Sequence, residues 1–547
     1  MGPIVKETDI SSILQRLRES DSEFTFTVVQ PSGELADVIA GSDNIRNYLQ
    51  GLLAGRPMTP RSWFYEKVDP AELVAEVKQH LETSAIRSPY SEEIKQFDLA
   101  YESKFGPQGG IPPLAETLDT VVRGFKRNPV DYNDPSWQLA KRNVIKRLGL
   151  RRQLKPWSYD RVIADMRTRN RITRYAGFPT GGKKSDPRNQ TLAKRDALNG
   201  KWKTYPAMLL FRFYKGKLRM VWMMPYSAVL VGGSYTNPLM AHLRSLGLPD
   251  FSQWEGFEFT ENALTKIWDP AADLAFGGDT SAMDEHMTIV QEQEVYDVLK
   301  EGFSERDWPL LWEYLQYESS VPLLIQPDIM LTGDHGKASG GTFTQLSETI
   351  YQEIVEEYAT LVVRRKLKGL LVIGDDYVRI AQGKEPLGST LVDIYARFGL
   401  PGKIEKQSDR PDLVTYCQRL FVKDWWRRGT NNTLGGIYAL LSALRSCVWP
   451  ENWVDPEDYP GHFSDMFVTK IAMIVENTIN HPEFVWFCKW AGRSQKDIIP
   501  FAKQASAKID KIWEKSKSVR GIGESYNQEK QDKPLSSYEC IKIWRSM

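Results

Sequence analysis

The sequence has few cysteines and no long apolar run. Its four cysteines, Cys417, Cys447, Cys488 and Cys540, are scattered without a CxxC pair. A zinc site or a disulfide framework is therefore not expected, and a reducing compartment fits. No apolar stretch approaches the roughly 20 residues that a membrane span needs, and the first ten residues, MGPIVKETDI, lack the apolar core of a signal peptide. We therefore expect no membrane partner.

Internal repeats and low-complexity blocks are also missing. The 547 residues exceed what one simple core needs and suffice for about three or four domain-sized units. A hydrophobic share of 41% and a charged share of 26% are ordinary for a globular protein. The 17 Trp, 23 Tyr and 22 Phe suit large cores or base-stacking surfaces without distinguishing between them.

The net charge of +1 hides a strong asymmetry. Residues 141–220 hold 23 Lys and Arg against 4 Asp and Glu, a charge of +19, so the rest of the chain carries −18. Aromatic residues alternate with these cations. Phosphate pairing combined with base stacking is typical of channels that bind single-stranded nucleic acid, whereas a solvated basic face is the simpler alternative. The segment therefore favours a polyanion as partner.

The pattern along the chain is mixed. Residues 70–105 and 113–150 read as helical, and two alternating runs split by Lys215-Gly216 predict a β-hairpin. A strand is expected at DLAFGGD, a long helix after a Gly-rich loop near Thr344, and a helix at LGSTLVDIYARFG. A short strand pair is expected around 403–422, and mostly helix from about 430. The middle is thus mixed α/β and the C-terminal part largely α.

Two adjacent carboxylates, Asp375 and Asp376, interrupt the strand-like stretch LLVIGDDYVRI at 370–380. A half-buried carboxylate is costly unless it is paired or binds a metal. The preceding Gly374 predicts a tight turn between two strands. Taken alone, an ordinary Gly-Asp hairpin turn is the simpler interpretation, and a cation site is the alternative.

A second acidic segment, FGGDTSAMDEH, ends the expected strand with Asp279 and has Asp284 five residues later. Two strands that carry Asp279 and the Asp375–Asp376 pair can place these carboxylates side by side. Such a cluster can bind two divalent cations about 3.5–4 Å apart, the arrangement used for in-line phosphoryl transfer. Mg²⁺ is preferred by such hard oxygen ligands, and Mn²⁺ is a substitute.

Between these acidic segments, GKASGGTFTQLSE places Ser339, Gly340 and Thr344 before the long helix. Small residues let a nucleotide approach the backbone closely, and the hydroxyls can bind a ribose. A Gly-rich helix start without a ligand is the alternative for this segment alone.

In order, D-x4-D, S-G-x3-T and GDD resemble the palm of viral RNA-dependent RNA polymerases. The hairpin between 212 and 219 is similar to that family's incoming-nucleotide motif, and YAGFPTGGKK resembles its template-binding motif more loosely. FGLPGKIEK resembles the motif with the lysine proposed as general acid, and VTYCQRLF resembles the primer grip. The matches span roughly 175–422. Chain length and the serine–glycine motif are closest to picobirnaviruses, then partitiviruses, among small double-stranded RNA viruses.

The resemblance implies roles for individual residues. Asp279 and Asp375 would hold two Mg²⁺ ions, with Asp376 in support. Asp284, Ser339 and Thr344, beside Gly340, would select ribonucleotides. Candidates for gripping the triphosphate are Arg212, Lys215, Lys217 and Arg219, with Arg212 and Arg219 preferred. Candidates for binding the template are Thr180, Gly181, Lys183 and Lys184. Lys403 or Lys406 would be the general acid, and the sequence does not choose between them.

One position departs from the family. The residue four after Thr344 is often Asn but is Glu348 here. An Asn-based sugar contact is therefore in doubt, which leaves recognition of the 2′-hydroxyl mainly to Asp284 and Ser339.

The resemblance also implies a right-hand polymerase of fingers, palm and thumb. We expect an N-terminal segment at 1–60 that bridges fingers and thumb, and fingers at 61–265 that include the basic region 141–220. The palm, an antiparallel sheet backed by helices, would span 266–425 with a fingers insertion near 290–330. A helical thumb at 426–515 would precede a polar, extended tail at 516–547 that is a candidate priming platform or plug.

The expected activity is RNA-directed RNA synthesis from NTPs on a viral, double-stranded RNA genome. Partners would be RNA template and product, NTPs and a viral capsid protein; the chain would act as a monomer in the virion interior and the host-cell cytoplasm. A reverse transcriptase or DNA polymerase is the first rival. Those enzymes commonly carry a bulky side chain where this chain has Asp284 beside the small Ser339. A non-enzymatic nucleic-acid-binding protein is the second rival, and it leaves the ordered acidic and glycine motifs unexplained.

Overall fold

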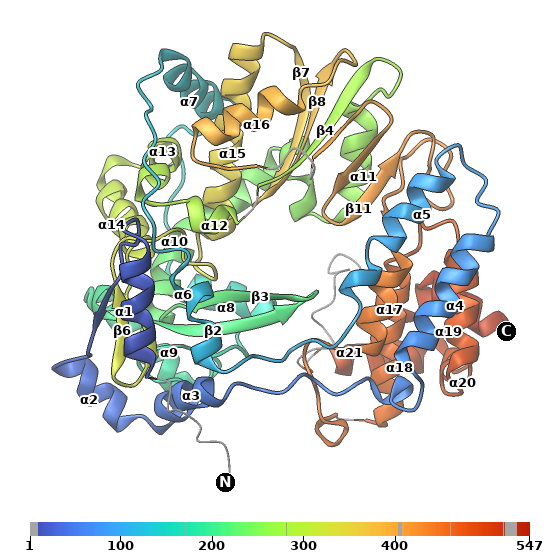
Figure 1. Ribbon diagram of the computed structural model, residues 1–547, viewed down its shortest axis with the longest axis horizontal. Coiled ribbons are helices and arrows are strands. Elements are labelled where there is room, and N and C mark those ends of the chain that lie inside the picture. The colour runs from blue at the N-terminus through green and yellow to red at the C-terminus, as the bar shows by residue number, and fades with distance from the viewer. Residues whose placement is uncertain are drawn as a thin grey trace.

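The computed structural model describes residues 9–169, 171–280, 282–402, 407–459, 461–517, 519 and 533–547, with only the backbone of Asp279 and Asp458. In this part of the chain the strands form a five-stranded sheet (β1-β6-β5-β2-β3), a four-stranded sheet (β7-β8-β4-β9) and a three-stranded sheet (β10-β11-β12). Helices surround all three (Figure 1). The mixed α/β class is therefore confirmed.

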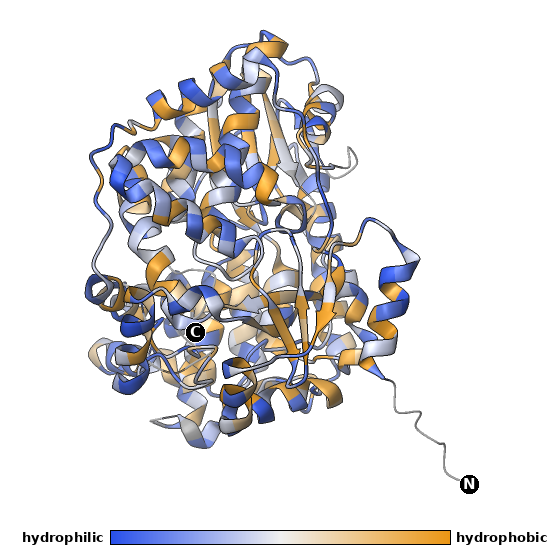
Figure 2. Cartoon of the chain, turned by 90° about the vertical axis from the view of Figure 1, so that its left-hand side faces the viewer, coloured by the Kyte–Doolittle hydropathy of each residue, from blue (hydrophilic) through white to orange (hydrophobic). Residues whose placement is uncertain are grey.

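The five-stranded sheet organises one side of the molecule, at the left and centre of Figure 1. Its strands are β1 (Thr27–Val29), β2 (Ala207–Tyr214), β3 (Lys217–Met223), β5 (Leu323–Gln326) and β6 (Ile329–Thr332). The helices of this lobe are α1 (Ile10–Ser20), α2 (Glu34–Gly41), α3 (Asp43–Ala54), α6 (Leu118–Val122), α8 (Tyr159–Thr168), α9 (Pro187–Leu198), α10 (Tyr226–Ser245) and α14 (Trp308–Glu318). Figure 2 shows strands that are mostly orange and helices with blue and orange on different faces, as expected for an apolar sheet covered by amphipathic helices.

The predicted hairpin around Lys215-Gly216 is confirmed as β2 and β3, paired from Met208↔Met223 to Tyr214↔Lys217. Segments distant in sequence complete its sheet: β5 pairs with β2 in parallel, and β1 pairs with β6. The N-terminal residues and the segment near 290–330 thus join the hairpin in one sheet.

The four-stranded sheet lies above this lobe in Figure 1 and is antiparallel throughout. It contains β4 (Asp273–Asp279), β7 (Leu367–Ile373), β8 (Asp376–Gln382) and β9 (Ser408–Arg410). Its neighbouring helices are α7 (Pro135–Arg147), α11 (Phe257–Ile267), α12 (Met283–His286), α13 (Ile289–Leu299), α15 (Thr344–Val363) and α16 (Gly388–Arg397). The expected strand at DLAFGGD, the hairpin at 370–380 and the helices after 344 and 388 are confirmed.

A helical bundle forms the third part, at the right of Figure 1, next to the small sheet of β10 (Leu413–Tyr416), β11 (Arg419–Val422) and β12 (Ile437–Tyr438). We call residues 63–105 with 438–517 and 533–547 the C-terminal bundle, because they share one hydrophobic core. Its helices are α4 (Pro70–Thr83), α5 (Ser91–Leu99), α17 (Leu440–Val448), α18 (Phe463–Glu476), α19 (Phe484–Ser494), α20 (Ile498–Ala502), α21 (Ser506–Ser516) and α22 (Glu539–Ser546).

The early helices α4 and α5 therefore pack with the C-terminal helices, apart from the rest of the segment 61–265 that we expected to form one unit. The apolar face of α4, with Leu73, Val77 and Leu81, is buried in the bundle core. The connection from α3 crosses between the two sides, where the Ser62 N–H donates to the Val448 carbonyl oxygen at 2.8 Å. The sequence could not predict this packing of α4 and α5, because an apolar helix face fits any helical core equally well.

The expectation of an extended tail is wrong for residues 533–547. Residues 539–546 form α22, and its Cys540, Ile541 and Trp544 are fully buried in the bundle. The spacing of these three residues makes one apolar helix face, which the polar composition of the surrounding segment concealed. Residues 520–532 lie outside the described part.

Three α-helices begin with the same dipeptide, Asp-Pro. The aspartates Asp69, Asp134 and Asp186 precede α4, α7 and α9, and each accepts a hydrogen bond from a backbone N–H of the first helical turn at 2.8–2.9 Å. Aspartate is a strong N-cap, and proline suits the first helical position because that N–H has no helical partner. These helix starts are thus set locally by sequence.

Every helix among the described residues is too short or too polar to cross a membrane.

Candidate active site

The Asp375–Asp376 pair lies at the tip of the β7–β8 hairpin. Ile373 pairs with Asp376, so Gly374 and Asp375 form a two-residue turn, and Gly374 has φ +58°, in the left-handed region that glycine adopts without strain. Asp375 is exposed, and Asp376 is half-buried as the first residue of β8. The hairpin interpretation is confirmed, and its turn presents a carboxylate outward.

Asp279 ends β4 directly opposite this turn. Its Cα is paired with that of Asp376, and the neighbouring Thr280 N–H donates to the Asp375 carbonyl oxygen at 3.2 Å. Residues directly opposite in an antiparallel pair have Cα atoms about 4.5–5.5 Å apart. The register therefore brings the backbones of the three aspartates together at one edge of the sheet, as expected.

Two glycines of β4 make room for this arrangement. A Cβ on Gly278 would overlap the Tyr377 ring, and a Cβ on Gly277 would lie 2.8 Å from a methyl group of Val414. The Tyr377 ring stacks on that of Tyr395, with centroids 4.9 Å apart. Gly278 thus lets an aromatic pair support the strand directly before Asp279.

We predict that Gly278→Ala lowers the melting temperature, because the added methyl group displaces Tyr377 and shifts Asp279. Thermal unfolding measures the effect. Gly51→Ala is the matched control, since no atom lies within 4 Å of its Cβ and the glycine sits inside α3. Equal behaviour of the two variants would contradict the steric role.

Helix α15 supports the turn from behind. The Thr349 hydroxyl accepts a hydrogen bond from the Gly374 N–H at 3.0 Å, and the Gln352 side chain donates to the Gly374 carbonyl oxygen. The Tyr395 hydroxyl donates to Gln352 Oε1 at 3.2 Å. Both backbone polar groups of the turn glycine are therefore satisfied by side chains of one helix, which fixes the position of Asp375.

Glu348, also on α15, brings a further carboxylate to the turn. Its Oε2 lies 3.1 Å from the position of a Cβ on Gly374, and the residue is buried. Burial raises the pKa of Glu348 well above its ordinary value, and the nearby charges of Asp284 and Asp375 raise it further. The residue that departs from the family pattern thus lies between the two acidic motifs.

Asp284 and Ser339 meet as the sequence predicted. The Ser339 hydroxyl is hydrogen-bonded to the Asp284 carboxylate, and Arg219 is close enough for its charge to act on Asp284. Burial nevertheless raises the pKa of Asp284 above its ordinary value. The Ser339 carbonyl oxygen accepts from the Trp222 N–H at 2.6 Å, which joins the Gly-rich loop to the β2–β3 hairpin.

Two other residues of this loop have mainly internal contacts. The Thr344 hydroxyl donates to the Ala338 carbonyl oxygen at 2.9 Å. Gly340 has φ +107°, and a Cβ there would lie 2.7 Å from the Trp222 carbonyl oxygen. Thr344 and Gly340 thus shape the loop, and Ser339 is the member that reaches Asp284.

A buried ion cluster lies beneath the Gly-rich loop and was not predicted from the sequence. Lys337 Nζ lies 2.9 Å from Glu292 and 2.7 Å from Glu318, and all three side chains are fully buried. Burial alone would lower the pKa of Lys337, but the two carboxylates outweigh it, so the pKa is raised and the amine stays charged. The Lys337 N–H also donates to the Asp284 carbonyl oxygen at 2.7 Å. No local sequence signal distinguishes Lys337 from a surface lysine.

The four cations of the β2–β3 hairpin differ in their surroundings. Arg219 acts on Asp284, and Lys217 is exposed. Arg212 Nη2 pairs with Glu451 Oε2 at 2.9 Å, and the Lys215 amine contacts Gln418. Burial lowers the pKa of Lys215 to about 6, with the charges of Arg445 and Lys104 adding to the shift. The structure thus brings Arg219 to the acidic cluster and directs Arg212 and Lys215 toward the C-terminal bundle and the small sheet.

The expected template residues lie together between α8 and α9. Lys183 is exposed beside Thr180 and Gly181, and a Cβ on Gly181 would lie 3.1–3.3 Å from Asn44 and Ile45 of α3. Lys184 Nζ lies 5.5 Å from the centroid of the Tyr226 ring. Burial lowers the pKa of Lys184 to about 8, with Arg174 and Arg171 contributing. The candidate acids Lys403 and Lys406 lie outside the described residues.

Whether the acidic turn suits a divalent cation depends on the ligand atoms that its side chains offer. Within the described residues, among which the Asp279 side chain is not included, no group of three His, Cys, Asp or Glu side chains has the arrangement of a metal site. The backbones of Asp279, Asp375 and Asp376 meet at the turn, where Asp375 is exposed and the Cys417 side chain is hydrogen-bonded to Asp376. The carboxylate oxygens of aspartates are ligands that Mg²⁺ and Mn²⁺ prefer.

Comparison with solved structures places this geometry in a known fold. The crystal structure of the RNA-dependent RNA polymerase of a human picobirnavirus matches with a TM-score of 0.77 and 19% sequence identity, covering 94% of this chain and 99% of that one. The fold is that of an RNA-dependent RNA polymerase. An insertion-loop deletion mutant of the picobirnavirus enzyme matches with a TM-score of 0.75, the same identity and the same coverage. No protein-family model matches the sequence, and no curated protein does either.

Proposed function

We propose that this chain is an RNA-directed RNA polymerase that copies a viral, double-stranded RNA genome. The observation that carries the proposal is the register that sets Asp279 opposite Asp376, with Asp375 in the adjoining turn. It occurs in a chain that shares the polymerase fold over 94% of its length. Neither an ordinary hairpin turn nor a non-enzymatic binding protein requires this alignment.

In this mechanism Asp279 and Asp375 would hold two Mg²⁺ ions, with Asp376 in support. Bound there, the ions would activate the attacking RNA 3′-hydroxyl and neutralise the charge that develops on pyrophosphate. Thr349 and Gln352 keep Asp375 in place through the turn. Asp284 and Ser339 form a polar pair suited to a ribose 2′-hydroxyl, and Arg219, whose charge acts on Asp284, would bind the triphosphate.

The partner proteins and the location follow from the same proposal. RNA template, RNA product and NTPs are the substrates and products, and a viral capsid protein is the expected partner. The enzyme would act as a monomer in the virion interior and the host-cell cytoplasm. In domain terms, the four-stranded sheet with its helices is the palm, the lobe of the five-stranded sheet the fingers, and the C-terminal bundle the thumb.

The direct test is nucleotide incorporation by the purified chain on a defined RNA template with Mg²⁺, with and without a primer. We expect template-dependent products from the four ribonucleotides and little from the deoxy forms, because the hydrogen-bonded pair Asp284–Ser339 is suited to binding a ribose 2′-hydroxyl. A preference for deoxynucleotides would favour the reverse transcriptase alternative, and RNA binding without synthesis would favour the binding-protein alternative.

Template binding should depend on pH through Lys184. Because burial lowers its pKa to about 8, the amine is charged below that pH and neutral above it. RNA affinity is therefore expected to fall as the pH rises from about 7 to about 9, by loss of one phosphate contact. Lys184→Arg should remove this dependence, since arginine stays charged. Filter binding at constant salt measures it, and an unchanged pH profile in the variant would contradict the role of Lys184.

A further inference from the structure

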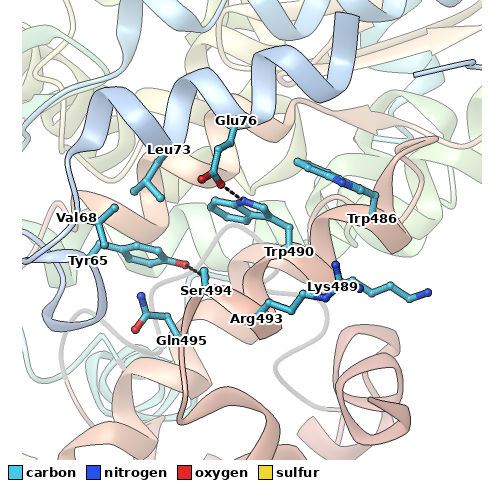
Figure 3. A pocket seen from close by; sticks show the side chains of 10 residues that line it. All are labelled: Tyr65, Val68, Leu73, Glu76, Trp486, Lys489, Trp490, Arg493, Ser494 and Gln495. Atoms are coloured by element: carbon cyan, nitrogen blue, oxygen red, sulfur yellow. Dashed lines mark hydrogen bonds between the residues drawn. The ribbon is translucent and has the colours of Figure 1, made fainter. Parts of the chain in front are cut away.

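A cavity on the C-terminal bundle is lined by none of the candidate active-site residues. It has a volume of about 390 Å³ and lies between α4 and α19 (Figure 3). Its apolar wall consists of Tyr65, Val68 and Leu73. Opposite this wall α19 presents Trp490, and Lys489 and Arg493 lie below the Trp490 ring in Figure 3.

The two tryptophans of the cavity are held in fixed positions. Trp490 donates its indole N–H to Glu76 Oε2 at 2.6 Å. The Trp486 ring stacks on His80 with centroids 3.7 Å apart, and His80 in turn contacts Glu483 at 2.5 Å. Both indoles are only half-buried. A rigid, accessible indole next to an apolar wall is a stacking surface for a planar base.

The cations at this cavity are available for a ligand. Lys489 and Arg493 are exposed, and neither makes an ion pair with a described residue. They are four residues apart, so they lie on the same side of α19. The segment 484–517 as a whole has 8 Lys and Arg against 3 Asp and Glu. An aromatic surface flanked by two free cations fits a phosphorylated aromatic ligand.

Glu76 narrows the choice of base. Glu76 is exposed; its Oε2 accepts from Trp490, while Oε1 makes no hydrogen bond to another described residue. A carboxylate oxygen beside a stacking ring can accept from a base whose edge carries donors, and guanine offers N1–H and the N2 amino group side by side. A volume of about 390 Å³ is at the lower end for ligand sites and suits one nucleotide, not a run of stacked bases.

The geometry points to a guanine-nucleotide site on the C-terminal bundle, separate from the candidate active site. The base stacks on Trp490, its N1–H and N2 amino group donate to Glu76, and its phosphates pair with Lys489 and Arg493. The assignment does not depend on the polymerase proposal, because it uses none of the residues near Asp375.

The experiment measures GTP binding to the full chain by titration calorimetry, with EDTA present and RNA absent, so that a metal-dependent site contributes little. We expect the double variant Lys489→Ala/Arg493→Ala to weaken binding about tenfold or more, since two charge-assisted contacts are lost. The matched control Lys508→Ala/Lys511→Ala removes two exposed cations of the same segment outside the cavity lining, and it should bind as the wild type does.

A second variant tests the base contact. Glu76→Gln keeps an oxygen acceptor for Trp490 but replaces the carboxylate, so the preference for GTP over ATP should fall about fivefold or more. Equal binding of GTP, ATP, CTP and UTP to the wild type would overturn the guanine assignment. Unchanged GTP binding in Lys489→Ala/Arg493→Ala would overturn the proposal. So would a cavity that binds a peptide of Glu and Tyr, or an RNA oligonucleotide, but no mononucleotide.

The two proposals can fail separately. RNA elongation by Lys489→Ala/Arg493→Ala should stay at the wild-type level, and Asp375→Asn should leave GTP binding in EDTA unchanged.

Discussion

Asp375→Asn is expected to reduce RNA synthesis about 10³-fold or more while RNA binding stays close to that of the wild type. The substitution keeps the size and the turn geometry but removes the negative charge that would hold a divalent cation. The side chain is exposed at the tip of the β7–β8 hairpin, so folding should be unaffected. Primer extension with Mg²⁺ measures activity, and filter binding measures RNA affinity.

The chain supplies a matched control for this variant. Asp328 is an exposed aspartate in the short turn between Gln326 and Ile329, the paired ends of β5 and β6. If aspartates in this protein only form turns, Asp328→Asn and Asp375→Asn should behave alike. We expect full activity from Asp328→Asn; an active Asp375→Asn variant would refute the metal role.

Lys337→Met is the substitution with the largest expected effect on stability. It removes the one cation shown between Glu292 and Glu318, both fully buried. Two carboxylates left without their charge partner should cost about 3–5 kcal/mol of unfolding free energy. The Gly-rich loop should loosen as well, because the Lys337 backbone is bonded to Asp284 and the Phe343 N–H donates to Glu318 Oε1 at 3.3 Å. Urea or thermal unfolding measures the loss.

Two further variants separate charge from packing. In Lys337→Met/Glu292→Gln/Glu318→Gln the buried groups are neutral, so much of the lost stability should return. Lys542→Met removes a lysine from an exposed pair with Glu539 at 2.6 Å and should change stability by about 0.5 kcal/mol or less. If the triple variant is no more stable than Lys337→Met, the charge argument for the cluster fails.

Local patterns allowed several elements to be predicted from the sequence. The alternation on both sides of Gly374 and on both sides of Lys215-Gly216 is confirmed by two hairpins with the expected turns. The strand that ends at Asp279 and the helix that begins at Thr344 are confirmed as β4 and α15. Each depends on neighbouring residues, because side-chain period and turn chemistry act over a few positions. The ribose, metal and template roles stay proposals.

Long-range packing decided what the sequence left open. The segment 63–105 is buried with residues beyond 438, and α22 closes the same core. The residues of these segments do not predict which helices they pack against, because an apolar helix face fits any core of suitable shape. The same holds for Lys337 and Glu348, whose charges are significant only because residues far apart in sequence bury them together.

By itself, the sequence determined which residue types stand at the ends of the strands, and therefore that the chain carries aspartates, small residues and cations in the order of a polymerase. Only the tertiary structure decided that Asp279 pairs with Asp376, that the charge of Arg219 acts on Asp284, and that Glu348 stands between the acidic motifs. The reason is physical. Side-chain chemistry is fixed by the covalent chain, whereas distance, burial and therefore pKa arise only when distant segments pack together.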